Sequence, residues 1–369
     1  MSNDNEVNKF AFLIHPLDMK DVSRVEPKAA NKRPQLVEKI LGWMPVHKKS
    51  EITGIQSITG KRVQGWFIAV PYLPKHFYKI DRNIVIGRII EGIKIAEDLG
   101  ASIVGLGGFT SIVGAAGITV SKSANIAVTS GNSYTIATAL EGSLIAAKKI
   151  GIDIDKAHIA VIGASGSIGK ACAQFLVTKC DRMTLIARSE IRLEKLAEII
   201  KENRGREVGI STNISTGIKD ADIVITATSS TGNIVMAEDL KPGSVVCDVS
   251  LPHDVSREVQ KLRPDVLVIE GGVVEVPGDV NFNYDFGYPS NVSLACMAET
   301  MILALEGRFE NFSLGRGIKL EKVEEIAKLG KKHGFKLAGF RSFDQFIIDD
   351  KFDAIKKAAS EKKASSQTI

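Results

Sequence analysis

Residues 158–176 (HIAVIGASGSIGKACAQFL) combine a strand, a glycine turn and the start of a helix. In a dinucleotide-binding turn the first glycine permits a tight bend, the second lets the backbone approach a pyrophosphate, and the third lets helix and strand pack closely. The first N–H groups of the helix then face the phosphates. The pattern predicts a dinucleotide site formed by Gly163, Ser165, Gly166, Ser167, Ile168 and Gly169. The alternative is an ordinary glycine turn between strand and helix, without a nucleotide.

The end of the next expected strand, residues 183–187 (MTLIA), indicates which nicotinamide cofactor is bound. An NAD site places a carboxylate there, which accepts a hydrogen bond from the ribose 2′-hydroxyl. This chain has Arg188, Ser189 and, one turn later, Arg192. Because guanidinium and hydroxyl groups suit a 2′-phosphate, the sequence predicts NADPH as the cofactor. The alternative is that both arginines belong to the solvated start of a helix.

Two further strands of this region end in small polar residues. Thr226, Ala227 and Thr228 follow one strand, and Asp248 and Ser250 follow another. Open α/β sheets bind ligands beyond the carboxyl ends of their strands. These five residues are therefore predicted to border the nicotinamide ribose, and the alternative is a pair of ordinary βα loops.

Cys296 is the candidate nucleophile. It stands near the start of an expected helix, where the positive end of the helix dipole favours a thiolate and lowers the pKa of the thiol. It also lies off the main apolar stripe of that helix. The alternative is that Cys296 fills the core, as most lone cysteines on helices do. Cys172 and Cys180 belong to the helix after the glycine turn and Cys247 to a strand, so these three are poorer candidates for the nucleophile.

Composition excludes several other classes of protein. The 48 Lys and Arg against 43 Asp and Glu give a net charge of +5, too small to indicate a nucleic-acid partner. The four cysteines form no C-x-x-C motif, so neither a metal site nor a disulfide framework is expected. Residues 99–121 carry no charge, but their six glycines favour buried loops and short strands over a transmembrane helix. A polar N-terminus without a signal-peptide core indicates a cytoplasmic protein.

Alternation of strands and helices from residue 158 to 270 predicts an α/β fold: a Rossmann-type doubly wound parallel sheet, with a second α/β substrate domain and C-terminal helices. The expected domains are 1–150 for substrate, 151–290 for NADP, 291–345 as a helical segment carrying the cysteine, and 346–369 as a Lys-rich tail. Other expected elements are a strand at 8–15, a hairpin at 50–70, helices at 77–99, 132–150, 291–306 and 321–333, and a fraying end at 351–369.

The chain resembles the cyanobacterial long-chain acyl-[acyl-carrier-protein] reductase family, which forms fatty aldehydes. The resemblance covers roughly residues 10 to 335 and departs from the family at Tyr134, where the family has histidine, and in the loop 278–289. The matching blocks, in family order, are 106–112, 131–135, 160–169, 270–275, 294–299, 305–307, 311–313 and 315–316.

This resemblance implies an NADPH-dependent reductase in which Cys296 carries the acyl group as a thioester. Tyr134 would replace the family's histidine as proton donor. The implied donor is an acyl carrier protein or acyl-CoA, with Arg308, Arg316 and Lys319 as docking residues, and an enzyme that consumes aldehyde is a possible partner. Loose membrane association would help to release an apolar product. The implied substrate-binding residues are Gly108, Phe109, Thr110, Ser111 and Asn132.

Two other interpretations remain open. Shikimate dehydrogenases share the glycine turn, the arginine after the second strand and the TATSS segment, which would make this an NADP-dependent dehydrogenase of a small hydroxy acid. That reaction needs a Lys/Asp pair, and no lysine lies near Asn132 in the sequence. The other interpretation is a non-catalytic NADP-binding protein, in which replacing Cys296 affects only stability.

Overall fold

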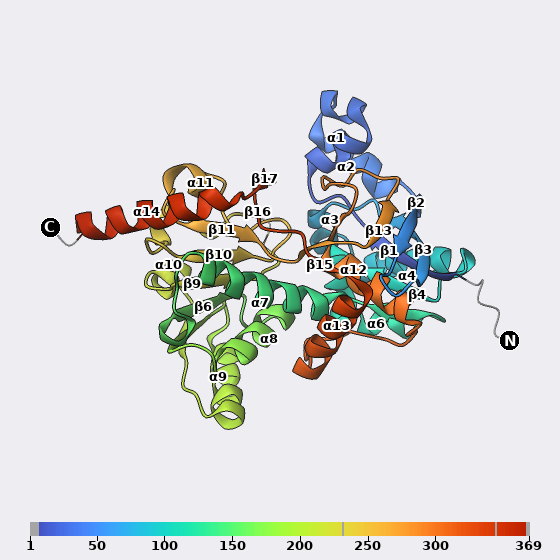
Figure 1. Ribbon diagram of the computed structural model, residues 1–369. Coiled ribbons are helices and arrows are strands. Elements are labelled where there is room, and N and C mark those ends of the chain that lie inside the picture. The colour runs from blue at the N-terminus through green and yellow to red at the C-terminus, as the bar shows by residue number, and fades with distance from the viewer. Residues whose placement is uncertain (1–6, 231, 344, 367–369) are drawn as a thin grey trace. The chain divides into compact units, whose positions relative to one another are not determined.

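The computed structural model describes residues 7–230, 232–343 and 345–366. The chain forms two compact units, each assembled from two separate segments (Figure 1). The first unit comprises Met1–Tyr134 and Val274–Ala338, and the second comprises Thr135–Val273 and Gly339–Ile369. The segment that carries Cys296 is therefore part of the N-terminal unit.

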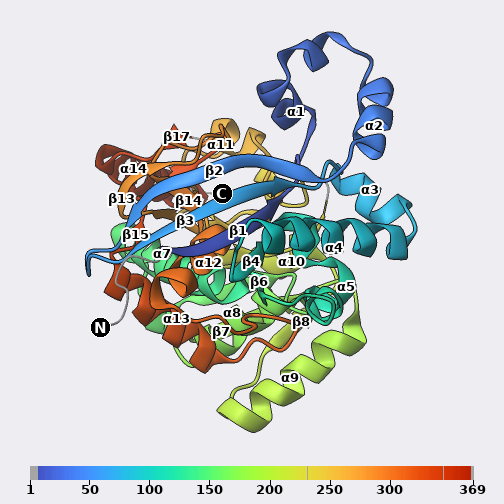
Figure 2. The same cartoon turned by 90° about the vertical axis from the view of Figure 1, so that its right-hand side faces the viewer.

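A six-stranded mixed sheet organises the first unit (Figure 2). Its inner strands run parallel, while β2 and the edge strand β13 run antiparallel to their neighbours. The expected hairpin is confirmed as β2 and β3, which turn at Gly60 with a φ of +86°. The strand order is β13 (Gly278–Asn281), β2 (His47–Gln56), β3 (Arg62–Ala69), β1 (Asn8–Ile14), β4 (Ile103–Leu106) and β5 (Ala127–Thr129).

Successive side chains of β1 pack on opposite faces of this sheet. Leu13 joins a core cluster that includes Ile89 of α4 (Arg82–Asp98). Phe12 faces the other way, toward Gly105 of β4 and helix α12 (Ala295–Glu306). A Cβ on Gly105 would lie 2.2 Å from Thr300 Oγ1 of α12, so glycine allows the helix to approach the sheet. Helix α12 is buried on nearly all sides, which its predominantly apolar sequence permits.

Several boundaries differ from the sequence prediction. The helix expected at 77–99 is two helices, α3 (Pro74–Lys79) and α4, because Asp81 caps α4 by accepting a hydrogen bond from the Asn83 N–H at 2.8 Å. The helix expected from residue 291 begins later, after the short strand β14 (Val292–Leu294).

The uncharged run 99–121 forms one buried strand, β4, and then short helical turns in place of further strands. These turns are η2 (Gly108–Ser111), α5 (Val113–Ala116) and α6 (Ile118–Ser121). Within the part of the chain that the structure describes, no helix has the length and apolar character needed to cross a membrane.

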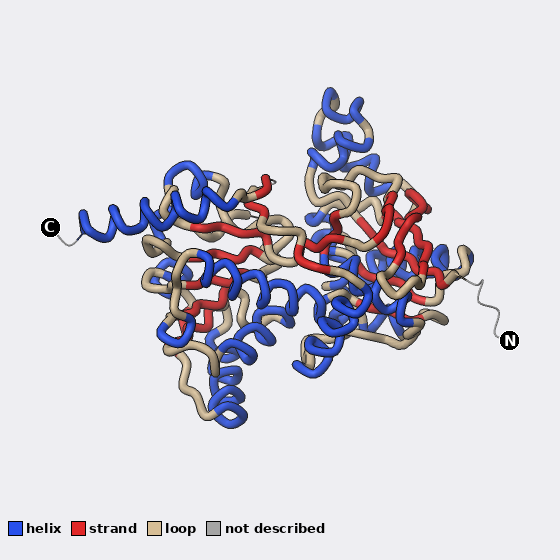
Figure 3. The backbone as a smooth tube through the Cα atoms, viewed as in Figure 1, coloured by secondary structure: helices blue, strands red, loops and turns tan. Residues whose placement is uncertain are grey.

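A six-stranded, all-parallel sheet forms the second unit, with helices between its strands (Figure 3). Numbered in chain order, its strands lie in the order 3-2-1-4-5-6, the Rossmann arrangement, which confirms the predicted fold class. From one edge to the other they are β8 (Gly209–Ser211), β7 (Arg182–Ile186), β6 (His158–Ile162), β9 (Ile223–Thr226), β10 (Val245–Asp248) and β11 (Leu267–Glu270).

The C-terminal residues continue the second unit as helix α14 (Asp349–Ser366). The expectation of a fraying tail is wrong for the described part of this segment. Phe352, Ile355 and Ala359 are buried, and the Phe352 ring lies 5.6 Å from the ring of Phe340. This apolar face holds the helix, and Lys351, Lys356, Lys357 and Lys362 are exposed to solvent.

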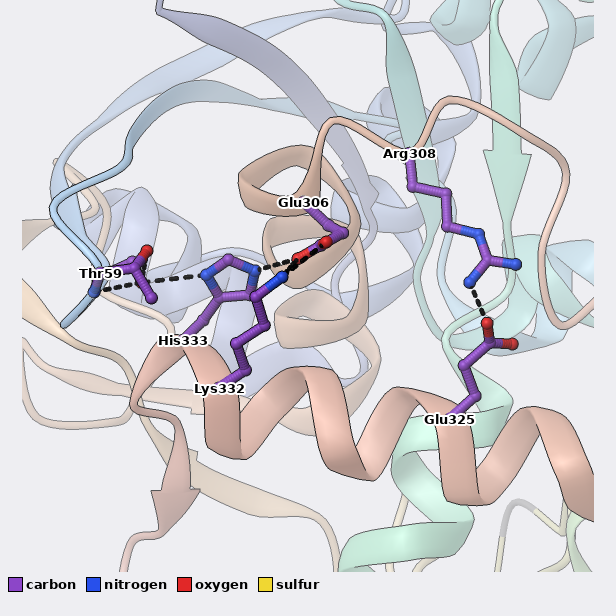
Figure 4. Close-up of polar contacts among 7 residues, drawn as sticks. Thr59, Glu306, Arg308, Glu325, Lys332 and His333 are labelled. Atoms are coloured by element: carbon purple, nitrogen blue, oxygen red, sulfur yellow. Dashed lines mark hydrogen bonds and ion pairs between the residues drawn. The ribbon is translucent and has the colours of Figure 1, made fainter.

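Polar contacts fix the C-terminal end of α12 within the first unit (Figure 4). His333, the last residue of α13 (Leu320–His333), is fully buried, and its Nε2 lies 2.8 Å from Glu306 Oε2. Lys332 Nζ donates to the same carboxylate at 2.7 Å. Burial lowers the pKa of His333, although the nearby Glu306 opposes this effect. The end of α12 remote from Cys296 is thereby attached to α13.

Candidate functional site

The candidate nucleophile lies at the carboxyl edge of the first sheet. Gly131, in the turn after β5, has a φ of +74° and lies directly against Cys296. A Cβ on this glycine would stand 2.3 Å from Cys296 Cα and 2.4 Å from its Cβ, so only glycine permits this contact. The structure thus brings together the sequence blocks around residues 131 and 296, at the sheet edge where α/β proteins bind ligands.

Cys296 is the second residue of α12 and is partly exposed as a residue, although its sulfur is surrounded by protein atoms, whereas Cys172, Cys180 and Cys247 are buried. Burial of the sulfur raises the pKa of the Cys296 thiol to about 12, although a hydrogen bond from the Met297 N–H opposes the shift. The expectation of a lowered pKa is therefore wrong. Desolvation of the sulfur outweighs the favourable helix N-terminus, and the negative charge of Glu299 adds to the upward shift.

Glu299, one helical turn after Cys296, is a buried residue that the sequence analysis did not identify. It accepts hydrogen bonds from the Thr129 hydroxyl and, at 2.8 Å, from the Tyr134 N–H. Burial raises the pKa of its carboxyl group, and these hydrogen bonds oppose the rise. The available signal was a lone carboxylate in the apolar segment 294–305. Glu299 ties α12 to the turn that contacts Cys296.

A second segment supports the same turn from residues 311–315. The Phe312 N–H donates to the Val128 carbonyl at 3.0 Å, which extends the sheet beyond β5. Ser313 Oγ donates to Ser133 Oγ at 2.7 Å, and the Ser130 hydroxyl donates to the Ser313 carbonyl. The turn beside Cys296 is therefore held by two elements that are distant from it in sequence.

The predicted substrate residues after β4 lie at the same sheet edge, but local bonds occupy their donor groups. The Phe109 N–H donates to His15 Nε2 at 2.9 Å, and the Thr110 and Ser111 hydroxyls donate to the carbonyls of Gly107 and Gly108 at 2.8 and 2.7 Å. The Gly107 N–H donates to the Leu13 carbonyl at 3.0 Å. This backbone amide is therefore already engaged and does not face a substrate oxygen as a free donor.

Asn132 opens α7 (Asn132–Lys149) directly after the turn at Gly131. Tyr134 is buried, and its ring lies against Gly330 of α13, where a Cβ would stand 2.7 Å from the phenolic oxygen. Its role as proton donor stays a prediction.

The glycine turn of the second unit has the geometry expected from its sequence. Gly163 has a φ of +79°, and a Cβ there would stand 2.3 Å from the Ala227 carbonyl oxygen. Gly169 lies so close to Gly163 that its Cβ would stand 2.4 Å from that residue's carbonyl oxygen. Gly166 is the N-cap of α8 (Ser167–Leu176) and leaves the helix N-terminus uncovered by a side chain. This strand, turn and helix form a cradle that fits a pyrophosphate.

Arg188 and Arg192 are exposed after β7, and Ser189 is the N-cap of α9 (Glu190–Arg204). Neither guanidinium forms an ion pair with a carboxylate of the described residues, so both are free to bind an anion.

The polar residues after β9 and β10 are joined by a buried carboxylate, Asp254, which the sequence analysis also missed. Thr228 Oγ1 donates to it at 2.7 Å, and Thr226 Oγ1 and Ser250 Oγ each donate at 2.5 Å. Burial raises the pKa of Asp254, and these three hydroxyls oppose the rise. Asp248 accepts from the Ser250 N–H at 3.0 Å. The hydrogen bonds from these three hydroxyls to Asp254 therefore connect the loop after β9 with the loop after β10.

Comparison with known proteins finds one family model that matches part of the chain and relatives that match most of it. Residues 145–269 match the family model described as shikimate / quinate 5-dehydrogenase. The long-chain acyl-[acyl-carrier-protein] reductase of Synechococcus elongatus is 31% identical over 301 residues, which cover 77% of this chain and 85% of that protein. The aminotransferase PigE of a Serratia species is 33% identical over 299 residues, covering 79% of this chain but only 34% of that protein. Among solved structures, L-tryptophan dehydrogenase from Nostoc punctiforme aligns with a TM-score of 0.39 at 12% identity, over 97% of this chain and 89% of that one.

The Rossmann unit and these relatives define the protein as an NAD(P)-dependent oxidoreductase. The extent of its identity with the Synechococcus enzyme makes the assignment more specific. The chain belongs to the long-chain acyl-[acyl-carrier-protein] reductase family.

Proposed function

We propose that this protein reduces a fatty acyl thioester, carried by acyl carrier protein or coenzyme A, to a fatty aldehyde through an acyl-Cys296 intermediate. The observation that carries the proposal is the packing of Gly131 against Cys296 at the N-terminus of α12, on the ligand-binding edge of the first sheet. Cys296 is also the one cysteine of the four that is not buried as a residue.

The first step is an exchange of thioesters. Cys296 Sγ attacks the acyl carbonyl carbon, the bond from that carbon to the donor sulfur breaks, and the proton lost by Cys296 ends on the departing thiol. The N–H groups in the first turn of α12 favour negative charge on the attacking sulfur. Glu299 acts through its hydrogen bonds, which keep the Thr129–Tyr134 turn in place against the cysteine.

The second step is a two-electron reduction. NADPH, when bound, would supply the hydride that the thioester carbonyl carbon gains in this step. The bond from that carbon to Cys296 Sγ then breaks, releasing the aldehyde, and the sulfur takes up a proton to restore the thiol. The chain's own contribution to cofactor binding is the glycine turn for the pyrophosphate, and Arg188, Ser189 and Arg192 for the 2′-phosphate.

The decisive experiment is intact-mass spectrometry after mixing the protein with palmitoyl-carrier protein without NADPH. Wild type and Cys180→Ala, a matched variant of a buried cysteine, are expected to gain one acyl group, and Cys296→Ala to gain none. Adding NADPH should discharge the adduct and release aldehyde. An absence of adduct on every protein, across several chain lengths and with both donors, would refute the covalent mechanism.

Carrier-protein docking belongs to the same proposal, with a narrower set of residues than the sequence suggested. Arg308 forms an ion pair with Glu325 (Figure 4) and another with Glu310, so its charge is already neutralised locally. Arg316 and Lys319 are exposed and are better suited to an acidic partner. Reversing both charges should raise KM for an acyl carrier protein but leave KM unchanged for acyl-N-acetylcysteamine, an uncharged thioester.

The match of residues 145–269 to shikimate and quinate dehydrogenases favours one alternative, oxidation of a small hydroxy acid. That match covers the nucleotide-binding part of the chain and leaves the Cys296 region outside it. The alternative predicts NADP-dependent oxidation of shikimate or quinate that survives Cys296→Ala. An assay of wild type and variant with both acids separates the two proposals.

A further inference from the structure

A helical excursion, residues 19–43, projects from the sheet of the first unit between β1 and β2 (Figure 2). It consists of α1 (Met19–Val25), the short helix η1 (Pro27–Asn31) and α2 (Pro34–Trp43). Its inner side has a small core of its own, in which Val37 and Leu41 of α2 pack with Val22, Ala29 and Leu73. The excursion therefore has a defined inner face and leaves the other face of α2 toward solvent.

That outer face is apolar, which is unusual for a solvent-exposed helix. Leu36 is 48% exposed, Ile40 46% and Trp43 71%. Their spacing of i, i+4 and i+7 places them in one row along the helix, which we call the α2 stripe. Lone exposed apolar residues are common on proteins, but a row that ends in an exposed tryptophan indicates a surface that is covered in use.

Basic residues lie close to the α2 stripe in the sequence. Lys28, Lys32, Arg33 and Lys39 are all exposed, and none of them pairs with a carboxylate of the described residues. Lys39 Nζ lies 4.8 Å from the centre of the Trp43 ring. The surface therefore presents positive charge beside apolar side chains.

Two of the four acidic residues in residues 18–43 form ion pairs. Asp18 caps α1 by accepting from the Lys20 and Asp21 N–H groups. Asp21 pairs with Arg24, and Glu38 pairs with Lys75. These pairs neutralise the charges of Asp21 and Glu38, whereas Asp18 and the exposed Glu26 have no ion pair among the described residues. The four unpaired basic residues Lys28, Lys32, Arg33 and Lys39 outnumber them.

We propose that the α2 stripe docks this protein on an anionic membrane surface. A ten-residue helix is too short to span a bilayer, so α2 would lie in the interface with Leu36, Ile40 and Trp43 among the acyl chains. Tryptophan prefers this depth, and the unpaired lysines and arginine would contact anionic headgroups. A protein partner or a second copy of this chain would cover the apolar row equally well, but the excess of unpaired basic residues in the same segment favours the anionic lipid surface.

The experiment uses the two tryptophans of the chain. Trp66 is buried, so Trp66→Phe leaves Trp43 as the sole reporter. Adding vesicles of 30% phosphatidylglycerol in phosphatidylcholine should shift Trp43 emission to the blue, and brominated lipid should quench it. The protein should bind vesicles of pure phosphatidylcholine at least roughly tenfold more weakly. High salt should weaken its binding to the anionic vesicles.

Two pairs of variants separate the apolar and electrostatic contributions. Leu36→Ser with Ile40→Ser should weaken vesicle binding by roughly tenfold or more, whereas Ile58→Ser, at an exposed residue of the β2–β3 turn, should not. Lys32→Glu with Arg33→Glu should abolish the preference for anionic vesicles, whereas Lys328→Glu with Lys331→Glu on α13 should leave it intact. Circular dichroism melting verifies that each variant is folded.

Three results would overturn the proposal. The first is Trp43 emission that does not respond to any vesicle. The second is binding that the serine variants leave unchanged. The third is a blue shift that appears without vesicles and grows with protein concentration, because it would assign the α2 stripe to contact between two copies of this chain.

Discussion

At Cys296, burial opposes the thiolate that acyl transfer requires. With the pKa of the thiol raised to about 12, the thiolate fraction grows tenfold with each pH unit through the working range. We therefore expect alkylation of Cys296 by iodoacetamide to accelerate by about tenfold per pH unit between pH 7 and 10. Peptide mass spectrometry after quenching gives the rate, and Cys296→Ala gives the background from the buried cysteines. A rate that levels off below pH 9 would show that the dipole of α12 prevails over burial.

His15 predicts the acid sensitivity of the fold. Burial lowers its pKa to about 4, although hydrogen bonds with the backbone of Pro16 and Tyr72 oppose the shift. Between pH 6.5 and 4 the unfolded chain binds a proton at this residue and the folded chain does not, so stability falls as pH falls through that window. His15→Gln keeps a donor and an acceptor but cannot titrate. It should remove roughly 2 kcal/mol from the loss of unfolding free energy between pH 7 and 5.

Urea unfolding of both proteins at pH 7 and pH 5 measures that difference. The comparison cancels the contributions of the other histidines with lowered pKa values, such as His76 and His158, which are common to both proteins. Equal losses in the two proteins would mean that His15 is already protonated in the folded state.

Residue types and spacing indicate Cys296 and the glycine turn because both depend on local geometry. Glu299 and Asp254 were missed because their importance depends on contacts between distant segments. Glu299 binds Thr129 across 170 positions, and Asp254 joins the loops after two different strands. A lone acidic residue has no sequence signature until the fold buries it.

Among the elements of the candidate site, the turn after β5 is the one most constrained by a single residue. Gly131 combines a positive φ with direct contact to Cys296, whereas Gly151 has a φ of +84° and a Cβ added there would meet no atom within 4 Å. Gly151→Ala should therefore cost about 1–2 kcal/mol from backbone strain alone. Gly131→Ala should cost more, because the Cβ also displaces α12 or the turn.

Thermal unfolding of the two alanine variants measures the cost, and the acyl-adduct assay measures its consequence. We expect Gly151→Ala to form the Cys296 adduct normally and Gly131→Ala to form little or none at a temperature where it remains folded. Equal melting temperatures for the two variants would show that the turn relaxes and that the contact with Cys296 is not restrictive.

Helical periodicity located most elements but not their ends. Residues 77–99 look continuous by apolar spacing, yet Asp81 starts a new helix there by capping it. Composition led to a wrong expectation for the C-terminal segment, because it predicted a fraying tail where the structure has helix α14. Its many lysines suggest a solvated tail, but the row of Phe352, Ile355 and Ala359 finds an apolar surface in the second unit. Whether such a row is buried depends on what the fold places beside it.

At the scale of the whole molecule, the order of segments along the sequence does not reveal which of them form one compact unit. The expected boundaries follow the chain from one domain to the next, whereas each observed unit takes two separate segments. The strand order of the second unit follows from its alternating pattern, but the return of residues 274–338 to the first unit depends on long-range pairing. The consequence is that Cys296 and the glycine turn belong to different units.

This separation predicts that acyl transfer and cofactor binding can be removed independently. Arg188→Ala should weaken NADPH binding by about 10- to 100-fold, because a charge-assisted hydrogen bond to the 2′-phosphate is lost, and should change NADH binding little. It should still form the acyl-Cys296 adduct at the wild-type rate but discharge it only at high NADPH. Cys296→Ala should bind NADPH normally, as measured by calorimetry, and form no adduct. If Arg188→Ala also lost the adduct, the two units would have to act together in acyl transfer, and if it weakened NADH and NADPH equally, the arginine would not contact the 2′-phosphate.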